Sequence, residues 1–153
     1  MSNWIPITKS NLYDGKIAAL IDACDTAALA AGQANRSTGL IQGVVNDIRG
    51  KIASCQRNRL DVNVAAIPSR LKDLATRRII WALKSAVEID PTEAEKIDYA
   101  NDTRDLNRIA SCDDVIEQPD NPLNSSTEMQ VSSGVTYKAG RRKASSKKMD
   151  GLI

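Results

Sequence analysis

The residue types that most often carry out catalysis are sparse in this sequence. Histidine is absent from its 153 residues, which removes Ser-His-Asp and Cys-His catalysis and most zinc and non-haem iron sites. No phosphate-binding loop with the spacing G-x-x-x-x-G-K-[ST] or G-x-G-x-x-G occurs. Carboxylates occur in two close pairs, Asp22/Asp25 and Asp102/Asp105, but both pairs lie in helical segments rich in opposite charges. We interpret them as solvated helix faces and expect no enzymatic activity, no cofactor and no metal.

Three cysteines, Cys24, Cys55 and Cys112, are odd in number and far apart. Because no C-x-x-C pair is present, neither a zinc knuckle nor a thioredoxin-type site is indicated. We expect three buried, reduced thiols in a protein made in a cytoplasm. The first residues lack a signal-peptide pattern, and no apolar run approaches the ~20 residues that span a bilayer. The sequence therefore predicts a soluble protein without membrane contact.

A basic cluster lies near the C-terminus, although the net charge of the chain is only +2. Residues 138–148 contain no acidic residue, and the cluster consists of Arg141, Arg142, Lys143, Lys147 and Lys148. It contacts nucleic acid, contacts an acidic protein surface, or is simply solvated. No aromatic residue is interleaved within it, so base stacking is not expected.

The strongest helical pattern covers residues 67–89, where the apolar residues share one face. We expect Pro68 at the first helical position and Asp90-Pro91 to end the helix. At 100° per residue, Trp81 points away from the apolar face. It falls in line with three basic residues, Arg70, Arg77 and Lys84, and together these four form what we call the Trp81 stripe. The stripe either fills a groove within its own fold or contacts a neighbouring subunit, because Trp and Arg are favoured interface anchors.

The remaining patterns predict an all-α fold, a small four-helix bundle. Residues 1–7 are expected to be extended, with Trp4 as a packing anchor. A first helix capped by Thr8 or Ser10 is expected to end near residue 31, and a second is expected over residues 39–56. The last helix is expected to begin with Asp90 as N-cap and to end near Cys112.

Two glycines, Gly43 and Gly50, lie on the face of the second helix opposite its apolar stripe. Each weakens a helix by ~1 kcal/mol relative to alanine. They are either tolerated as neutral positions or allow the backbone of a neighbouring chain to approach closely.

The character of the sequence changes after residue 112, so we divide the chain into a helical body, residues 1–112, and a C-terminal tail, residues 113–153. Residues 113–126 contain two prolines and no helical period, and are expected to form an extended acidic linker. Two β-prone pieces follow, one with Met129 and Val131 and one with Val135 and Tyr137. They predict a hairpin, or a strand that pairs with a sheet edge of another chain.

Several stretches together carry a resemblance to a known family. They are Trp4-Ile-Pro-Ile-Thr8 followed by Leu12, residues 40–53 with Ile48-Arg49-Gly50, Ile67-Pro68 before a long helix, Tyr99 with Leu106 and Ile109-Ala110, Val131-Ser-Ser, and the ending MDGLI. Through their order and spacing the chain resembles the small head-to-tail adaptor, or head-completion (connector), proteins of tailed phages. It looks closest to a domain-of-unknown-function group of Mu-like prophages.

The resemblance implies a structural virion protein of the phage neck, assembled in the host cytoplasm. Twelve copies would form a ring that binds the portal and connects the DNA-filled head to a stopper, tail terminator or other tail protein, with genomic DNA passing through the channel. The subunit interface would include the Trp81 stripe, Gly43 and Gly50. The portal-binding residues of the tail would be Met129, Val131, Val135, Tyr137, Leu152 and Ile153. The alternative is a small helical DNA-binding protein that uses its basic C-terminal tail.

Overall fold

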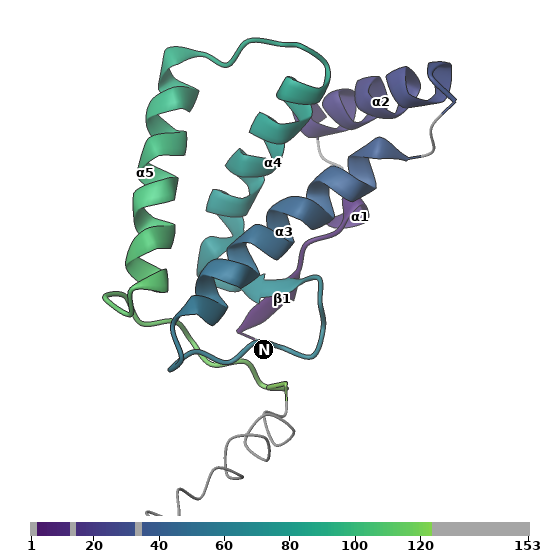
Figure 1. Cartoon of the computed structure of the whole chain (residues 1–153). Helices are drawn as coiled ribbons and strands as arrows, with labels where there is room; N and C mark the ends of the chain where they lie inside the picture. Colours follow the sequence, from purple (N-terminus) through teal and green to yellow (C-terminus); the bar gives the residue numbers. More distant parts are fainter. Residues whose placement is uncertain (1–2, 13–14, 33–34, 124–153) are drawn as a thin grey trace, which may run out of the picture. The chain divides into compact units, whose positions relative to one another are not determined.

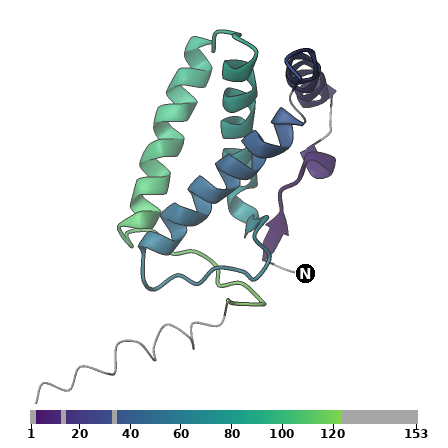
Figure 2. The same ribbon diagram turned by 45° about the vertical axis from the view of Figure 1, so that its right-hand side comes forward.

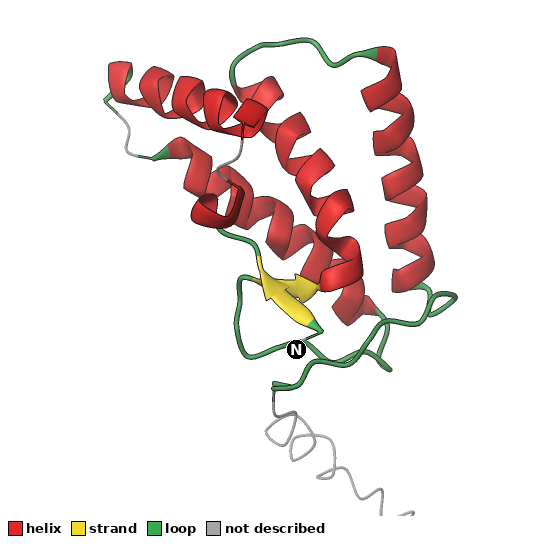
Figure 3. Cartoon of the chain, turned by 180° about the vertical axis from the view of Figure 1, so that it is seen from behind, coloured by secondary structure: helices red, strands yellow, loops and turns green. Residues whose placement is uncertain are grey.

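Residues 3–12, 15–32 and 35–123 are described by the computed structural model, and they are mostly helical (Figure 1). In chain order the elements are β1 (Trp4–Pro6), α1 (Lys9–Leu12), α2 (Gly15–Ala30), α3 (Arg36–Ser54), β2 (Ala66–Pro68), the 3₁₀ helix η1 (Ser69–Leu71), α4 (Lys72–Ala86) and α5 (Glu93–Ala110). Within the described ranges the helices outweigh the single two-stranded sheet, which Figure 3 shows in yellow.

Helix α3 forms the centre of the core and contacts α2, α4 and α5. Its spacing of apolar residues predicts one buried stripe, and this prediction is confirmed, since Ile41, Val45, Ile48 and Ile52 are all buried. Figure 2 shows α3 crossing obliquely beside α4 and α5. Buried side chains of the other helices complete the core, among them Ile21, Leu74, Ile79, Leu83, Leu106 and Ile109. Burying a branched aliphatic side chain contributes ~1.5–3 kcal/mol, so this contiguous cluster is the main source of stability.

The predicted helix over residues 67–89 begins later than expected, because its first residues pair as a strand. β2 is antiparallel to β1, with Trp4 opposite Pro68 and Ile5 opposite Ile67. Pro68 has extended dihedral angles, φ −54° and ψ 136°, so its placement at the first helical position is wrong. The expected extended N-terminus is confirmed, and Trp4 is 2% exposed, as an anchor should be.

The start of α5 also differs from the prediction. Asp90 is not the N-cap, because the helix begins at Glu93 and Thr92 caps it. The Thr92 side chain accepts from the N–H of Glu95 and the Glu95 carboxylate accepts from the N–H of Thr92, which is a complete capping box. The expected end near Cys112 agrees with the observed end at Ala110.

The segment after α5 packs against the rest of the body as far as Leu123. Ile116 is 2% exposed, and the Nε1–H of Trp4 donates to the carbonyl of Glu117 at 2.8 Å. The N–H of Leu123 donates to the carbonyl of Leu60 at 2.7 Å. The described residues form one compact unit that ends at Leu123. Residues 113–123 therefore belong to the body, although we placed the boundary at residue 112.

Candidate functional site: the seam between α4 and α5

Helices α4 and α5 lie side by side and run in opposite directions (Figures 1 and 2). A ladder of ion pairs follows their line of contact, which we call the seam. Its members are Lys84 with Glu95 at 2.5 Å, Arg77 with Asp102 at 2.5 Å, and Arg70 with Asp114 at 3.0 Å. The residue numbers fall on the basic side as they rise on the acidic side, as an antiparallel pair requires.

Lys84, Trp81 and Arg77 of the Trp81 stripe lie on this seam. Arg70, in η1, continues the line by pairing with Asp114 beyond the end of α5. The stripe points away from the buried face of α4, as the helical spacing predicts, but α5 and the segment after it meet that side. Each of the three cations is neutralised by a carboxylate of the same chain. Trp81 is half-buried, and its ring stacks on Tyr99 of the same chain. Its contact with a neighbouring subunit stays a prediction.

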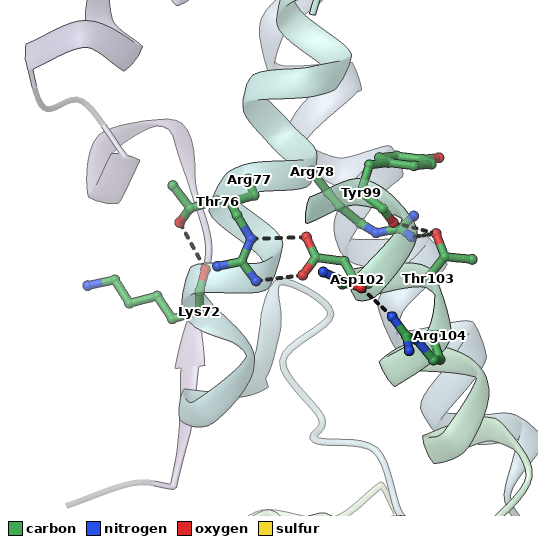
Figure 4. A network of polar contacts seen from close by, with 9 residues as sticks. Lys72, Thr76, Arg77, Arg78, Tyr99, Asp102, Thr103 and Arg104 are labelled. Carbon is green, nitrogen blue, oxygen red and sulfur yellow. Dashed lines mark hydrogen bonds and ion pairs between the residues drawn. The ribbon is translucent and has the colours of Figure 1, made fainter. Parts of the chain in front are cut away.

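An aromatic pair joins the two helices at the middle of the seam. The rings of Trp81 and Tyr99 are stacked, with centroids 4.5 Å apart and planes 26° apart. The guanidinium of Arg78 lies 4.5 Å from the centroid of the Tyr99 ring, within the range of a cation–π contact. Its Nη2 donates to the hydroxyl of Thr103 at 2.5 Å (Figure 4). Stacking, cation–π attraction and a hydrogen bond therefore act together where the helices meet.

The pair of Arg77 and Asp102 contains the most buried carboxylate of the seam. Both guanidinium donors, Nε and Nη2, reach the two carboxylate oxygens at 3.1 and 2.5 Å (Figure 4). Asp102 is 2% exposed, so our interpretation of Asp102 as part of a solvated face is wrong, whereas its neighbour Asp105 is exposed as expected. The hydrogen bonds to Asp102 raise the pKa of Arg77, which stays charged.

Glu95 links the start of α5 to α4. The hydrogen bond from the Lys84 ammonium and the capping bond from the Thr92 N–H hold the pKa of Glu95 below its ordinary value. The Glu95 carboxylate thus caps α5 and also forms the ion pair of the seam that lies nearest the turn between α4 and α5. A protonated Glu95 would lose both interactions.

Two hollows meet at Trp81. The first, about 60 Å³, is lined by Arg77, Ile80, Trp81, Glu95, Asp98, Tyr99 and Asp102. The second, about 240 Å³, lies at the turn between the helices and is lined by Trp81, Ser85, Glu88, Ile89, Asp90 and Pro91. Their linings combine aromatic surface with carboxylates.

The two glycines of α3 lie on an open surface. A Cβ atom built on Gly43 or Gly50 meets no atom within 4 Å, so nothing in the described part of the chain requires glycine there. This leaves both alternatives in place, tolerance and close approach by a neighbouring chain.

Arg49, for which the sequence predicts no role of its own, is buried beneath the loop before β2. Its Nη1 donates to the carbonyls of Asn63 at 2.9 Å and Ala66 at 2.7 Å, and its Nη2 donates to that of Asp61 at 2.8 Å. Its guanidinium carbon lies 5.9 Å from the centroid of the Trp4 ring. Burial lowers the pKa of Arg49, with Asp61 opposing the shift. A signal was present in the sequence, since position 49 follows Val45 by one helical turn and lies on the apolar side of α3.

Asp25 is a second carboxylate that we wrongly placed on a solvated face. It accepts from the Lys9 ammonium at 2.5 Å and from the N–H and hydroxyl of Ser37 at 3.0 and 2.9 Å. Burial by itself would raise the pKa of Asp25, but these hydrogen bonds outweigh it and hold the pKa below its ordinary value. Asp25 therefore ties α2 to the start of α1 and to the first turn of α3.

The cysteines correct another expectation. Cys55, directly after α3, and Cys112, just after α5, form a disulfide with their Cα atoms 5.3 Å apart. Cys24 is the free, buried thiol that we expected, and burial raises its pKa. The sequence does not predict this disulfide, because the packing of the helices, and not the spacing of the cysteines in the chain, brings the two residues together.

Within the described ranges, no group of three His, Cys, Asp or Glu side chains has the geometry to hold a metal ion. The same part of the chain has no helix that is both long and apolar enough to cross a bilayer. The predicted tail residues (Met129, Val131, Val135, Tyr137, Leu152 and Ile153) and the basic cluster, Arg141 to Lys148, lie outside the described residues.

Comparisons with protein-family models, with curated proteins and with solved structures find no match to this chain.

Proposed function

We propose that this chain is a structural virion protein, the adaptor subunit of a ring in the neck of a tailed phage. The ring, of twelve subunits, binds the portal and connects the DNA-filled head to the tail. α2, α3, α4 and α5 form the four-helix bundle of each subunit, and residues 124–153 supply the segment that reaches the portal.

One observation carries this proposal. Three of the stretches on which the resemblance rests meet at a single place in the fold. Trp4-Ile-Pro of the opening pairs with Ala66-Ile67-Pro68 before the long helix. Arg49, from the Ile48-Arg49-Gly50 stretch of the second helix, donates to the carbonyl of Ala66 and lies over the Trp4 ring. Three stretches that are far apart in the sequence thus form one structural unit. This contact is a physical reason for the three stretches to occur together in one chain.

The α3 surface with Gly43 and Gly50 is the subunit contact that we propose. It is open in the single chain, and helix backbones approach most closely where side chains are absent. The Trp81 stripe contributes through the exposed part of the seam, since its cations already have partners in the same chain.

The decisive experiment offers the purified chain two partners, the portal protein of the same phage and duplex DNA. The adaptor proposal expects stable binding to the assembled portal. It also expects DNA binding to be weak at physiological salt. Tight binding to duplex DNA, falling steeply with salt while the portal is ignored, would establish the DNA-binding alternative instead.

A further inference from the structure

The N-terminal half of α5 is the least covered helical segment next to the core. Within residues 93–100 only Glu95 is partly buried, whereas the second half of the helix buries Leu106 and Ile109. Apolar surface is exposed here too, at Ile97 (62% exposed) and, in the preceding turn, at Ile89 (45% exposed). This end of the helical pair presents a face that nothing in the described chain occupies.

Carboxylates predominate in the linings of the two hollows. Asp98 lines the first hollow, and Glu88 and Asp90 line the second. None of these three carboxylates has an ion-pair partner among the residues the structure describes. The one cation in the linings, Arg77, is held on Asp102. A cationic group that enters the second hollow therefore finds Glu88 and Asp90 without a described ion-pair partner, whereas Asp98 of the first hollow already lies close enough to Arg77 to act on its charge.

The aromatic wall between the hollows suits the same kind of group. The Tyr99 ring already binds one guanidinium, that of Arg78, at 4.5 Å. Trp81, stacked on Tyr99, lines both hollows, and indole is the strongest cation–π acceptor among the side chains. An arginine or lysine stem can lie on exposed apolar surface while its charged end reaches a carboxylate.

We propose that the surface around Trp81, formed by Trp81, Glu88, Ile89, Asp90, Asp98 and Tyr99, is a docking site for an arginine- or lysine-bearing segment of another protein. Charge complementarity and the aromatic wall select this occupant over an acidic or purely apolar segment. The inference goes beyond the adaptor proposal, which uses Trp81 in a contact between subunits. The two assignments of the Trp81 surface exclude each other, and the experiment below separates them because the site is complete in one chain.

The chain contains its own reporter and its own control. Trp81 lies in the site, whereas the other tryptophan, Trp4, is buried and donates its Nε1–H to Glu117. We would add a short arginine–glycine peptide to the ¹⁵N-labelled full chain and follow the two indole N–H signals by NMR, assigned with Trp81→Phe. The expected result is a saturable shift of the Trp81 signal alone. A peptide with glutamine in place of arginine should leave both signals in place.

Two charge variants make the test specific. Asp98→Asn should weaken peptide binding about threefold to fivefold, the size expected for one partly exposed ion pair. Asp47→Asn removes the same charge from an exposed position on α3 and should leave binding unchanged. Equal weakening by both variants would mean non-specific attraction and overturn the proposal, as would the absence of a Trp81 shift. A Trp81 shift that follows protein concentration without peptide would assign the face to a second copy of this chain and also overturn it.

Discussion

Arg49 organises the loop that connects α3 to β2. Two backbone carbonyls of that loop and the carbonyl of Ala66 at the start of β2 accept hydrogen bonds from one guanidinium. The loop is also braced from within, since Asp61 accepts from the N–H of Asn63 and the Asn63 side chain accepts from the N–H of Ala65. A buried cation is favourable only with such partners. The carbonyl of Asn63 also accepts from the N–H of Ala66 at 3.0 Å. Arg49 therefore holds β2 in register with β1.

Replacing Arg49 tests this role. Arg49→Met keeps much of the side-chain volume but leaves three acceptors without the guanidinium donor, so we expect the free energy of unfolding to fall by about 3 kcal/mol. Urea unfolding measures the loss. Arg57→Met, at an exposed position in the loop between α3 and β2, serves as the control and should change the free energy of unfolding little. Equal stability of the two variants would contradict the assigned role.

Asp25 gives the fold a defined response to acid. Its pKa is lower in the folded chain than in the unfolded chain, where a value of about 3.9 is normal. The ionised form therefore stabilises the fold above that value, and this contribution is lost as the pH falls through the folded pKa. We expect the unfolding free energy of Asp25→Asn to depend less on pH below about 4 than that of the parent chain. Asp47→Asn should keep the parent's dependence, and a parallel curve for Asp25→Asn would refute the assignment.

The sequence predicted single residues well where local spacing decides their position. The buried stripe of α3 and the anchor role of Trp4 followed from periodicity and side-chain type. The prediction that Asp25 and Asp102 lie on solvated helix faces is wrong because their hydrogen-bond partners, Ser37 and Arg77, come from other helices. The helical spacing of charged residues does not show which of them a second helix will cover, so their burial cannot be predicted from one segment alone.

The disulfide joins the C-terminal ends of α3 and α5. It closes a loop with a sequence separation of 57, for which chain entropy gives a stabilisation of about 4 kcal/mol. Treatment with dithiothreitol, or the double change Cys55→Ser and Cys112→Ser, should therefore lower the urea midpoint strongly. Cys24→Ala, which leaves the disulfide intact, should keep the response to dithiothreitol. A midpoint that dithiothreitol does not change would show that the bond is not formed in solution.

Replacing the glycines of α3 by alanine can affect the stability of the subunit and the assembly of the ring in opposite directions. Because the added methyl groups meet no atom, Gly43→Ala and Gly50→Ala should each raise the unfolding free energy by about 0.5–1 kcal/mol. If neighbouring backbones approach this face, the same variants should weaken ring assembly on the portal. Gly39→Ala, also open and near the start of the helix, is the matched comparison. More stable subunits that assemble as well as the parent would exclude the close-approach alternative.

Element boundaries were predictable only where a helix has a strong local signal. The apolar faces of α3 and α4 and the end of α5 were recovered, but β1 and β2 are too short to be recognised without each other. Residues 66–68 satisfy a helical apolar spacing, yet pairing with β1 fixes them as a strand. Contact between distant segments decides whether such a short stretch becomes a strand or a helix. The same kind of contact forms the α4–α5 seam and the disulfide, so these too could not be predicted from local sequence.

The body and the segment after residue 123 are expected to have separate roles. The described core, including Ile116, lies within residues 1–123. We therefore expect a chain that ends at Leu123 to unfold with the parent's cooperativity and urea midpoint, but no longer to bind the portal. Circular dichroism and a portal co-sedimentation assay measure the two properties. Normal portal binding by the shortened chain would move the portal contact into the body.

The most direct test of the adaptor account is electron microscopy of the full chain mixed with the portal of the same phage. The account predicts particles in which a ring of twelve copies lies against one end of the portal, visible in end-on class averages. Portal particles without an added ring, under conditions in which the chain is folded and in excess, would contradict it.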